Sequence, residues 1–162
     1  MGMSTMPSVK TRLATAGDLA AIVALTEAAY APYTAAFGAP PLPVTEDYAP
    51  RIAHGEITLL EDGGEVAGLV VLERHPQHAL IFSVAVAPAY QGKGLGIALL
   101  RHAEHQARAW AVLELRLYTN ARMERNIAIY AAYGFHETGR RSNPHRPGWT
   151  LVDMAKAVAA AS

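Results

Sequence analysis

Residues 79–100, A-L-I-F-S-V-A-V-A-P-A-Y-Q-G-K-G-L-G-I-A-L-L, decide the fold of this chain. An apolar run over residues 80–86 is followed by Pro88, whose ring removes a backbone donor and favours an extended residue before it. The glycine-rich motif Gln91-Gly92-Lys93-Gly94-Leu95-Gly96 comes next, and apolar residues at helical spacing begin within it. The order predicts a buried strand, a tight glycine loop and a helix.

The glycine loop predicts a site for a phosphorylated cofactor. Glycines let the backbone approach a ligand closely, and the first turn of a helix leaves several N–H groups unpaired. Together with the helix dipole, these groups favour a phosphate or pyrophosphate. A Walker-type loop does not fit, because Gly94 follows Gly92-Lys93 where Ser or Thr is required. A dinucleotide fingerprint fails as well, because Ile97 stands where its third glycine would be.

Length and composition indicate one globular domain. The chain has 162 residues, 51% of them hydrophobic, with 14 basic and 14 acidic side chains and no cysteine. The balanced charge gives no basic surface for nucleic acid or an anionic membrane, and no apolar run was expected to span a membrane. With no signal peptide expected at residues 1–7, a cytoplasmic setting is predicted. We expect a domain over residues 8–157 and flexible termini at 1–7 and 158–162.

Periodicity places the remaining elements. The helix that starts near Asp18 is expected to break at Pro32, and residues 32–43 are expected to form an ordered loop over a pocket. Asp62-Gly63-Gly64-Glu65 predicts a hairpin turn. The other predicted helices cover residues 45–54, 94–111 and 123–133, and the predicted strands cover residues 8–15, 56–60, 66–74, 80–86, 112–118, 135–140 and 149–154. Residues 141–147 are expected to form a polar loop. This order predicts a mixed α/β single domain.

A second motif extends the pattern of the glycine loop. Residues 126–135, N-I-A-I-Y-A-A-Y-G-F, place Asn126 one helical turn before Tyr130 and end in Gly134-Phe135. With the glycine loop, this motif resembles the GNAT-type N-acetyltransferases, which use acetyl-CoA, over about residues 9–156. Residues 117–120 (L-Y-T-N), followed by Met123, are similar to bacterial small-substrate branches of that family. The resemblance implies a mostly antiparallel central sheet with a splayed parallel pair, flanked by helices on both faces.

The resemblance also implies the cofactor site. The backbone of Val84 and Val86 would bind the pantetheine arm, and the Val84 N–H would polarise the acetyl carbonyl. Tyr130 would be the general acid, because an ordinary tyrosine is protonated at neutral pH. The residues implied in holding the cofactor are Val84, Val86, Gln91, Gly92, Lys93, Gly94, Leu95, Gly96, Asn120, Asn126 and Tyr130.

The sequence also suggests the order of the reaction, several candidates for the general base and a set of residues for the acceptor pocket. Because no cysteine is present, direct transfer in a ternary complex is predicted. The resemblance implies a small primary amine as the acceptor. Where histone-type relatives have a glutamate base, Leu80 stands here, and the alternatives are Glu73, His75, His78, Glu124 and Ser83 acting through water. Candidate acceptor-pocket residues are Tyr30, Tyr33, Phe37 and Tyr48. A basic polar loop contains Arg140, Arg141, Asn143, His145 and Arg146. It either binds a substrate carboxylate or is a solvated surface loop.

Two other functions stay open from the sequence. The missing glutamate at Leu80 is compatible with a catalytically idle CoA-binding module on the same fold. An acyltransferase for peptide or protein amines is a further alternative. The histidines show no metal-ligand spacing, so no metal is predicted, and either a monomer or a homodimer is expected.

Overall fold

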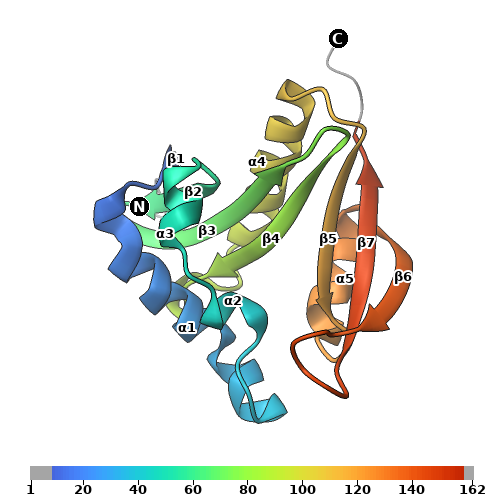
Figure 1. Ribbon diagram of the computed structural model, residues 1–162. Helices are drawn as coiled ribbons and strands as arrows, with labels where there is room; N and C mark the ends of the chain where they lie inside the picture. The colour runs from blue at the N-terminus through green and yellow to red at the C-terminus, as the bar shows by residue number, and fades with distance from the viewer. Residues whose placement is uncertain (1–8, 159–162) are drawn as a thin grey trace, which may run out of the picture.

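A computed structural model describes residues 9–158 of the chain (Figure 1). Within this range, seven strands form one sheet in the spatial order β1-β2-β3-β4-β5-β7-β6, and only β4 and β5 of these pair in parallel. The elements run in the order β1 (Val9–Leu13), η1 (Ala16–Asp18), α1 (Leu19–Phe37), α2 (Leu42–Thr45), α3 (Ala49–Ala53), β2 (Ile57–Asp62), β3 (Glu65–Arg74), β4 (His78–Val86), η2 (Pro88–Tyr90), α4 (Leu95–Ala109), β5 (Glu114–Asn120), α5 (Glu124–Tyr133), β6 (His136–Ser142) and β7 (Thr150–Ala157). The predicted mixed α/β fold is confirmed.

The parallel pair is splayed. β4 and β5 are in register only from His78↔Glu114 to Ile81↔Leu117. Beyond that point β4 stays paired with β3 as far as Val86, and β5 stays paired with β7 as far as Asn120. The two strands run apart toward their carboxyl ends (Figure 1). Each therefore has an unpaired edge that faces the other.

Helices cover both faces of the sheet, with α1 on one face and α4 and α5 on the other (Figure 1). Two-residue alternation along β4 sends Ile81 into the core under α4 and Phe82 into the core under α1. Helix α4 buries one stripe of side chains, including Leu99, Leu100 and Ala103. The sheet is thereby fixed between two apolar layers, and the splay opens between them.

The segment after β1 differs from the prediction at Pro32. Helix α1 continues through Pro32 and ends at Gly38, whose φ of 77° is the left-handed conformation of a helix C-cap. Pro32 is exposed, so the backbone carbonyl that it leaves unbonded can reach water. The expected helix over residues 45–54 is instead two short helices, α2 and α3, because Glu46 is extended between them. Pro50 occupies the first turn of α3, where its missing N–H costs no helical hydrogen bond.

One finding about α1 was not expected from the sequence. Residues 16–37 are long and apolar enough to pass a length-and-composition test for a membrane-spanning helix. In the structure this helix packs on the sheet with Ile22, Leu25 and Thr26 buried. The core helix of a soluble protein and a signal sequence near the N-terminus pass the same test, so a single helix of this kind is weak evidence for a membrane span.

The C-terminal hairpin is longer than predicted. β6 reaches Ser142, so Arg141 lies in a strand and the connecting loop covers residues 143–149 instead of 141–147. Val158, expected in a flexible tail, donates a backbone hydrogen bond to Leu113. The expectations for residues 1–7 and 159–162 fall outside the described part of the chain.

A buried carboxylate ties α4 to α5 and β7. Glu104 is 5% exposed and accepts hydrogen bonds from Tyr133 (2.8 Å), Arg108 (2.8 Å) and Lys156 (3.0 Å). Burial alone would raise the pKa of Glu104, but hydrogen bonds from Tyr133 and Lys156 and the nearby cations outweigh burial and lower it. The ionised form is therefore the one that stabilises the fold.

We expect Glu104→Gln to lower the free energy of unfolding by roughly 2–3 kcal/mol at pH 7, because it leaves Lys156 and Arg108 without their anion. A lowered carboxyl pKa gives stability that is present above the unfolded value and lost as the pH falls through the folded value. The difference in free energy of unfolding between wild type and variant should therefore become smaller below about pH 4.5. Urea unfolding of both proteins at pH 7 and pH 3.5 measures these free energies. The same difference at both pH values would contradict the prediction.

Candidate active site

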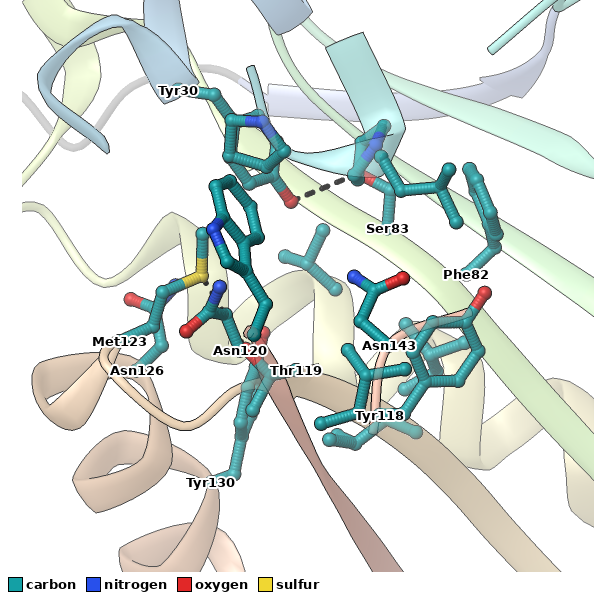
Figure 2. A pocket seen from close by; sticks show the side chains of 18 residues that line it. Tyr30, Phe82, Ser83, Tyr118, Thr119, Asn120, Met123, Asn126, Tyr130 and Asn143 are labelled. Atoms are coloured by element: carbon teal, nitrogen blue, oxygen red, sulfur yellow. Dashed lines mark hydrogen bonds between the residues drawn. The ribbon is translucent and has the colours of Figure 1, made fainter. Parts of the chain in front are cut away.

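A pocket opens where β4 and β5 diverge. Figure 2 shows the 18 side chains that line it, which come from β4, β5, β7, α1, α2, α5 and the segments between helices and strands. Residues 81–84 of β4 and 117–120 of β5 form two of its walls. The other lining residues are Tyr30, Pro41, Leu42, Pro43, Met123, Asn126, Tyr130, Asn143, Trp149 and Leu151. The splay thus brings together Val84, Asn120, Asn126 and Tyr130 from the predicted set.

The open edge of β4 carries the backbone groups of Val84 and Val86. Ala87 donates its N–H to the carbonyl of Ala67 at 2.8 Å, so that amide points toward β3. Backbone N–H groups alternate in direction along an antiparallel strand, so the N–H of Ala85 also points toward β3. The N–H groups of Val84 and Val86 point to the opposite edge of β4, where β5 is no longer paired with it. An extended ligand arm laid along this edge finds donors and acceptors in the arrangement of an added strand.

The glycine loop lies directly after this edge. Gly92 and Gly94 have φ values of 78° and 80°, a region that glycine adopts without strain, and a Cβ added at either would meet no atom within 4 Å. The Gln91 side chain donates to the Val86 carbonyl at 3.1 Å and fixes the loop to the end of β4. Gly94 caps α4, whose first-turn N–H groups have no intrahelical partner.

The loop fits a pyrophosphate by this geometry. Gly96 is in the first turn of α4 and has open space where a side chain would be. Leu95 has its side chain in the core, so it can contribute only backbone groups. Lys93 is exposed and places a positive charge at the loop. Phosphate oxygens at this position would meet unpaired N–H donors and the positive end of the helix dipole.

Two asparagines line the inner part of the pocket. Asn120 is 7% exposed; its Oδ1 accepts the Arg122 N–H at 2.8 Å, and its Nδ2 has no partner among the described residues. A buried amide donor without a partner is costly unless a ligand satisfies it. Asn126 accepts a hydrogen bond of 3.4 Å from the hydroxyl of Tyr33. Tyr33, expected to line the acceptor pocket, thus lies behind Asn126 and positions it.

Tyr130 extends from α5 into the pocket and is half-buried. Its ring packs edge-on against Phe135 at 6.0 Å between centroids, and the structure records no hydrogen bond from its hydroxyl to a residue of the described range. Burial raises the pKa of Tyr130 above its ordinary value, and neighbouring Tyr30 and Tyr33 raise it further. Its hydroxyl is therefore protonated throughout the neutral range.

The three other residues expected to line the acceptor pocket lie in different places. Tyr30 lines the pocket, with its hydroxyl 3.3 Å from the Ser83 Oγ (Figure 2). Phe37 is not a lining residue but packs edge-on against Trp149, which is, at 5.5 Å. Tyr48 was expected in the pocket and is instead a core side chain, 1% exposed, whose hydroxyl donates to the Pro43 carbonyl at 2.6 Å.

The candidate bases lie outside the pocket, with the exception of Ser83. Glu73 accepts hydrogen bonds from Arg51 (2.8 Å) and interacts with His75 (2.9 Å). Burial alone would raise the pKa of Glu73, but these contacts outweigh burial and lower it. His78 and Leu80 line a second cavity, on the sheet surface that β5, β6 and β7 share. Glu124 is exposed and is not among the lining residues.

The predicted basic loop does not act as one unit. Arg140 pairs with Glu137, and Arg141 pairs with Asp153 at 2.9 Å. Asn143 lines the pocket and accepts the His145 N–H at 2.9 Å. Arg146 donates to the Pro40 carbonyl at 3.0 Å and so joins the β6–β7 connection to the end of α1.

Some lining residues were missed by sequence reasoning. Phe82, Tyr118 and Trp149 form much of the aromatic wall. Tyr118 carried a signal, because it alternates with the buried leucines of β5 and must face the opposite side. Trp149 carried none, because only the fold brings the β6–β7 connection against α1. Within residues 9–158, no group of three or more His, Asp or Glu side chains is placed to hold a metal.

Part of the sequence is similar to that of known N-acetyltransferases. The [ribosomal protein bS18]-alanine N-acetyltransferase of Escherichia coli (strain K12) is 34% identical over 84 residues, which cover 52% of this chain and 57% of that protein. The mycothiol acetyltransferase of Corynebacterium glutamicum (strain R) is 33% identical over 81 residues, 49% of this chain and 28% of that protein. The chain thus matches about half the length, or less, of these curated relatives.

Solved structures share the whole fold. The ribosomal-protein-S18-alanine N-acetyltransferase from Escherichia coli superposes with a TM-score of 0.76 at 26% identity, covering 95% of this chain and 96% of that one. The PaiA N-acetyltransferase from Thermoplasma acidophilum, solved in complex with coenzyme A, has a TM-score of 0.78 at 18% identity. The match covers 93% of this chain and 99% of that chain, and at this identity it shows only that the fold is shared. Residues 22–135 match the acetyltransferase (GNAT) family, which uses acetyl-CoA. The chain belongs to the GNAT acetyltransferase family.

Proposed function

We propose that residues 8–157 form an N-acetyltransferase that moves an acetyl group from acetyl-CoA to the primary amine of a small molecule by direct transfer in a ternary complex. One observation carries the proposal: Val84 on the open edge of β4 and Tyr130 line one splayed pocket, and the glycine loop follows that edge, where Gln91 donates to the Val86 carbonyl. Acetyl-CoA would supply an acetyl thioester that is activated toward attack by an amine. The chain has no cysteine, so a cysteinyl acyl-enzyme is excluded.

The residues predicted to bind the cofactor or to act in catalysis have the following roles in this scheme. The backbone of residues 91–96 binds the pyrophosphate, and Val86, Asn120 and Asn126 hold the pantetheine arm. The Val84 N–H donates to the acyl oxygen, and such a donor contributes about 3–4 kcal/mol. As the C–N bond forms and the C–S bond breaks, the proton of Tyr130 goes to the sulfur. The surplus proton on nitrogen leaves to water, from which Tyr130 is reprotonated.

A second candidate acceptor is the α-amine of a peptide or protein. The supporting observation is the 34% identity to an enzyme named for an alanine in ribosomal protein bS18. A panel of amino-acid amides, polyamines, aminoglycosides and short peptides separates the two classes of acceptor. We place the protein in the cytoplasm, as a monomer or homodimer, with no nucleic-acid or membrane partner.

Calorimetry with acetyl-CoA tests the cofactor assignment, and release of free CoA thiol tests turnover across the acceptor panel. We expect binding and acceptor-dependent thiol release. Absence of acetyl-CoA binding would contradict the proposed function. Binding without turnover of any acceptor would instead favour a catalytically idle CoA-binding module, which the family comparison does not favour.

A further inference from the structure

The walls of the splayed pocket carry no charged side chain. Its 18 lining residues, all within the described range, include no Asp, Glu, His, Lys or Arg. The polar groups are hydroxyls and amides from Tyr30, Ser83, Tyr118, Thr119, Asn120, Asn126, Tyr130 and Asn143. Burial raises the pKa of Tyr30, Tyr118 and Tyr130, so these hydroxyls stay neutral. An ammonium group that entered would lose hydration without gaining a counter-ion.

Two arginines lie against aromatic rings at or next to the wall of this pocket. Arg146 lies over the ring of Trp149 at 5.8 Å, and Arg122 lies over Phe37 at 4.3 Å, next to Trp149. Neither arginine forms a salt bridge with a residue of the described range. A second positive charge at the mouth of the pocket would be repelled by both.

Charges behind the other aromatic walls are already paired. Arg51 lies 3.9 Å from the ring centre of Phe82 and forms salt bridges to Glu46, Glu56 and Glu73. Arg141 lies over Tyr118 at 5.2 Å and is paired with Asp153. His75 stacks on His78 at 4.5 Å and contacts Glu73, away from the pocket. Among the described residues, these carboxylates and imidazoles are held in other contacts, so no carboxylate or imidazole that could act as a base lines the pocket.

From this arrangement we infer that the acceptor is a weakly basic amine that is substantially uncharged near neutral pH, such as the α-amine of a peptide or amino-acid amide, and not an alkylamine such as a lysine side chain or a polyamine. The inference rests on the proposed function and specifies its substrate class. At pH 7 an α-amine of pKa about 8 is roughly one-tenth neutral, whereas a lysine amine of pKa about 10.4 is neutral in about one molecule in 2,500. An enzyme that neither attracts nor deprotonates the ammonium is limited by this fraction.

Two isomeric acceptors test the inference on one scaffold. Nε-acetyl-lysine amide exposes only an α-amine, and Nα-acetyl-lysine amide exposes only an ε-amine. With the full chain at pH 7 and saturating acetyl-CoA, we expect kcat/KM to be at least about 100-fold higher for the α-amine isomer. We also expect kcat/KM for each isomer to rise with pH up to the pKa of its own amine, so that the two profiles differ by about two pH units.

A protein variant provides the complementary change. Asn143→Asp adds a carboxylate to the pocket wall while keeping the oxygen that accepts the His145 N–H. We expect it to bind the ammonium and reduce the preference for the α-amine at least about 10-fold. Asn143→Gln, which lengthens the side chain without charge, is the matched control and should leave the preference unchanged.

The outcomes separate this inference from the proposed function. Equal or faster turnover of the ε-amine isomer would overturn the inference while leaving the acetyltransferase assignment intact. A rising limb at one common pH for both isomers would also overturn it, because an enzyme group would then be the base. Failure to bind acetyl-CoA in calorimetry would contradict the proposed function itself.

Discussion

Tyr130→Phe should lower kcat for acetyl transfer by about 10²–10³-fold while leaving the dissociation constant for acetyl-CoA within about threefold of wild type. The substitution removes one hydroxyl from the pocket and keeps the ring that packs against Phe135. The departing thiolate would then have to take its proton from water. Single-turnover kinetics at saturating acetyl-CoA, with calorimetry for affinity, measure the two quantities separately.

Tyr133 provides the control for this experiment. It lies on the same helix, but its hydroxyl donates to Glu104 at 2.8 Å and does not line the pocket. Tyr133→Phe should lower the free energy of unfolding by about 1 kcal/mol and leave kcat unchanged. A loss of kcat in Tyr133→Phe equal to that in Tyr130→Phe would contradict the assignment of Tyr130 as the general acid.

Gly96→Asp should weaken acetyl-CoA binding by at least about 100-fold without loss of fold. The carboxylate would stand in the first turn of α4, where it would compete with the pyrophosphate for N–H donors and repel it. The helix itself tolerates the change, since an acidic residue near a helix N-terminus is stabilising by about 0.3–1 kcal/mol. Calorimetry and a thermal melt together separate lost binding from lost structure.

Gly96→Ala is the matched variant at the same position. An added Cβ meets no atom within 4 Å and φ at Gly96 is not positive, so alanine fits without strain. We expect its affinity for acetyl-CoA to stay within about threefold of wild type and its melting temperature to rise slightly, because alanine favours a helix over glycine. Wild-type affinity in Gly96→Asp would show that the cofactor phosphates bind elsewhere.

Local chemistry explains why much of the fold was predictable from the sequence. The strand–loop–helix unit over residues 79–100 combines an apolar run, a proline stop and glycines that must adopt positive φ, and each signal is local. The Asp62–Glu65 turn and the stop of α5 at Gly134 are local as well. Pro32 was misinterpreted, because its effect on a helix depends on whether the neighbouring carbonyl can reach solvent, which only tertiary structure decides.

The site was predictable where motifs set backbone geometry, and less so where side chains meet across the fold. Val84, Asn126 and Tyr130 lie in one pocket as expected from the resemblance. Tyr48 was misplaced because an aromatic residue in a proline-rich segment has the same local pattern whether it points into a core or a pocket. Trp149 entered the site through long-range packing against α1, which no periodicity encodes.

A crystal structure of the chain with acetyl-CoA tests the central claim most directly. The account predicts the pyrophosphate on the backbone of residues 91–96, the pantetheine arm along the open edge of β4, and the acyl oxygen about 3 Å from the Val84 nitrogen. It also predicts the sulfur beside the Tyr130 hydroxyl. A cofactor bound away from the β4–β5 splay, or an acyl group that does not reach Val84 and Tyr130, would contradict it.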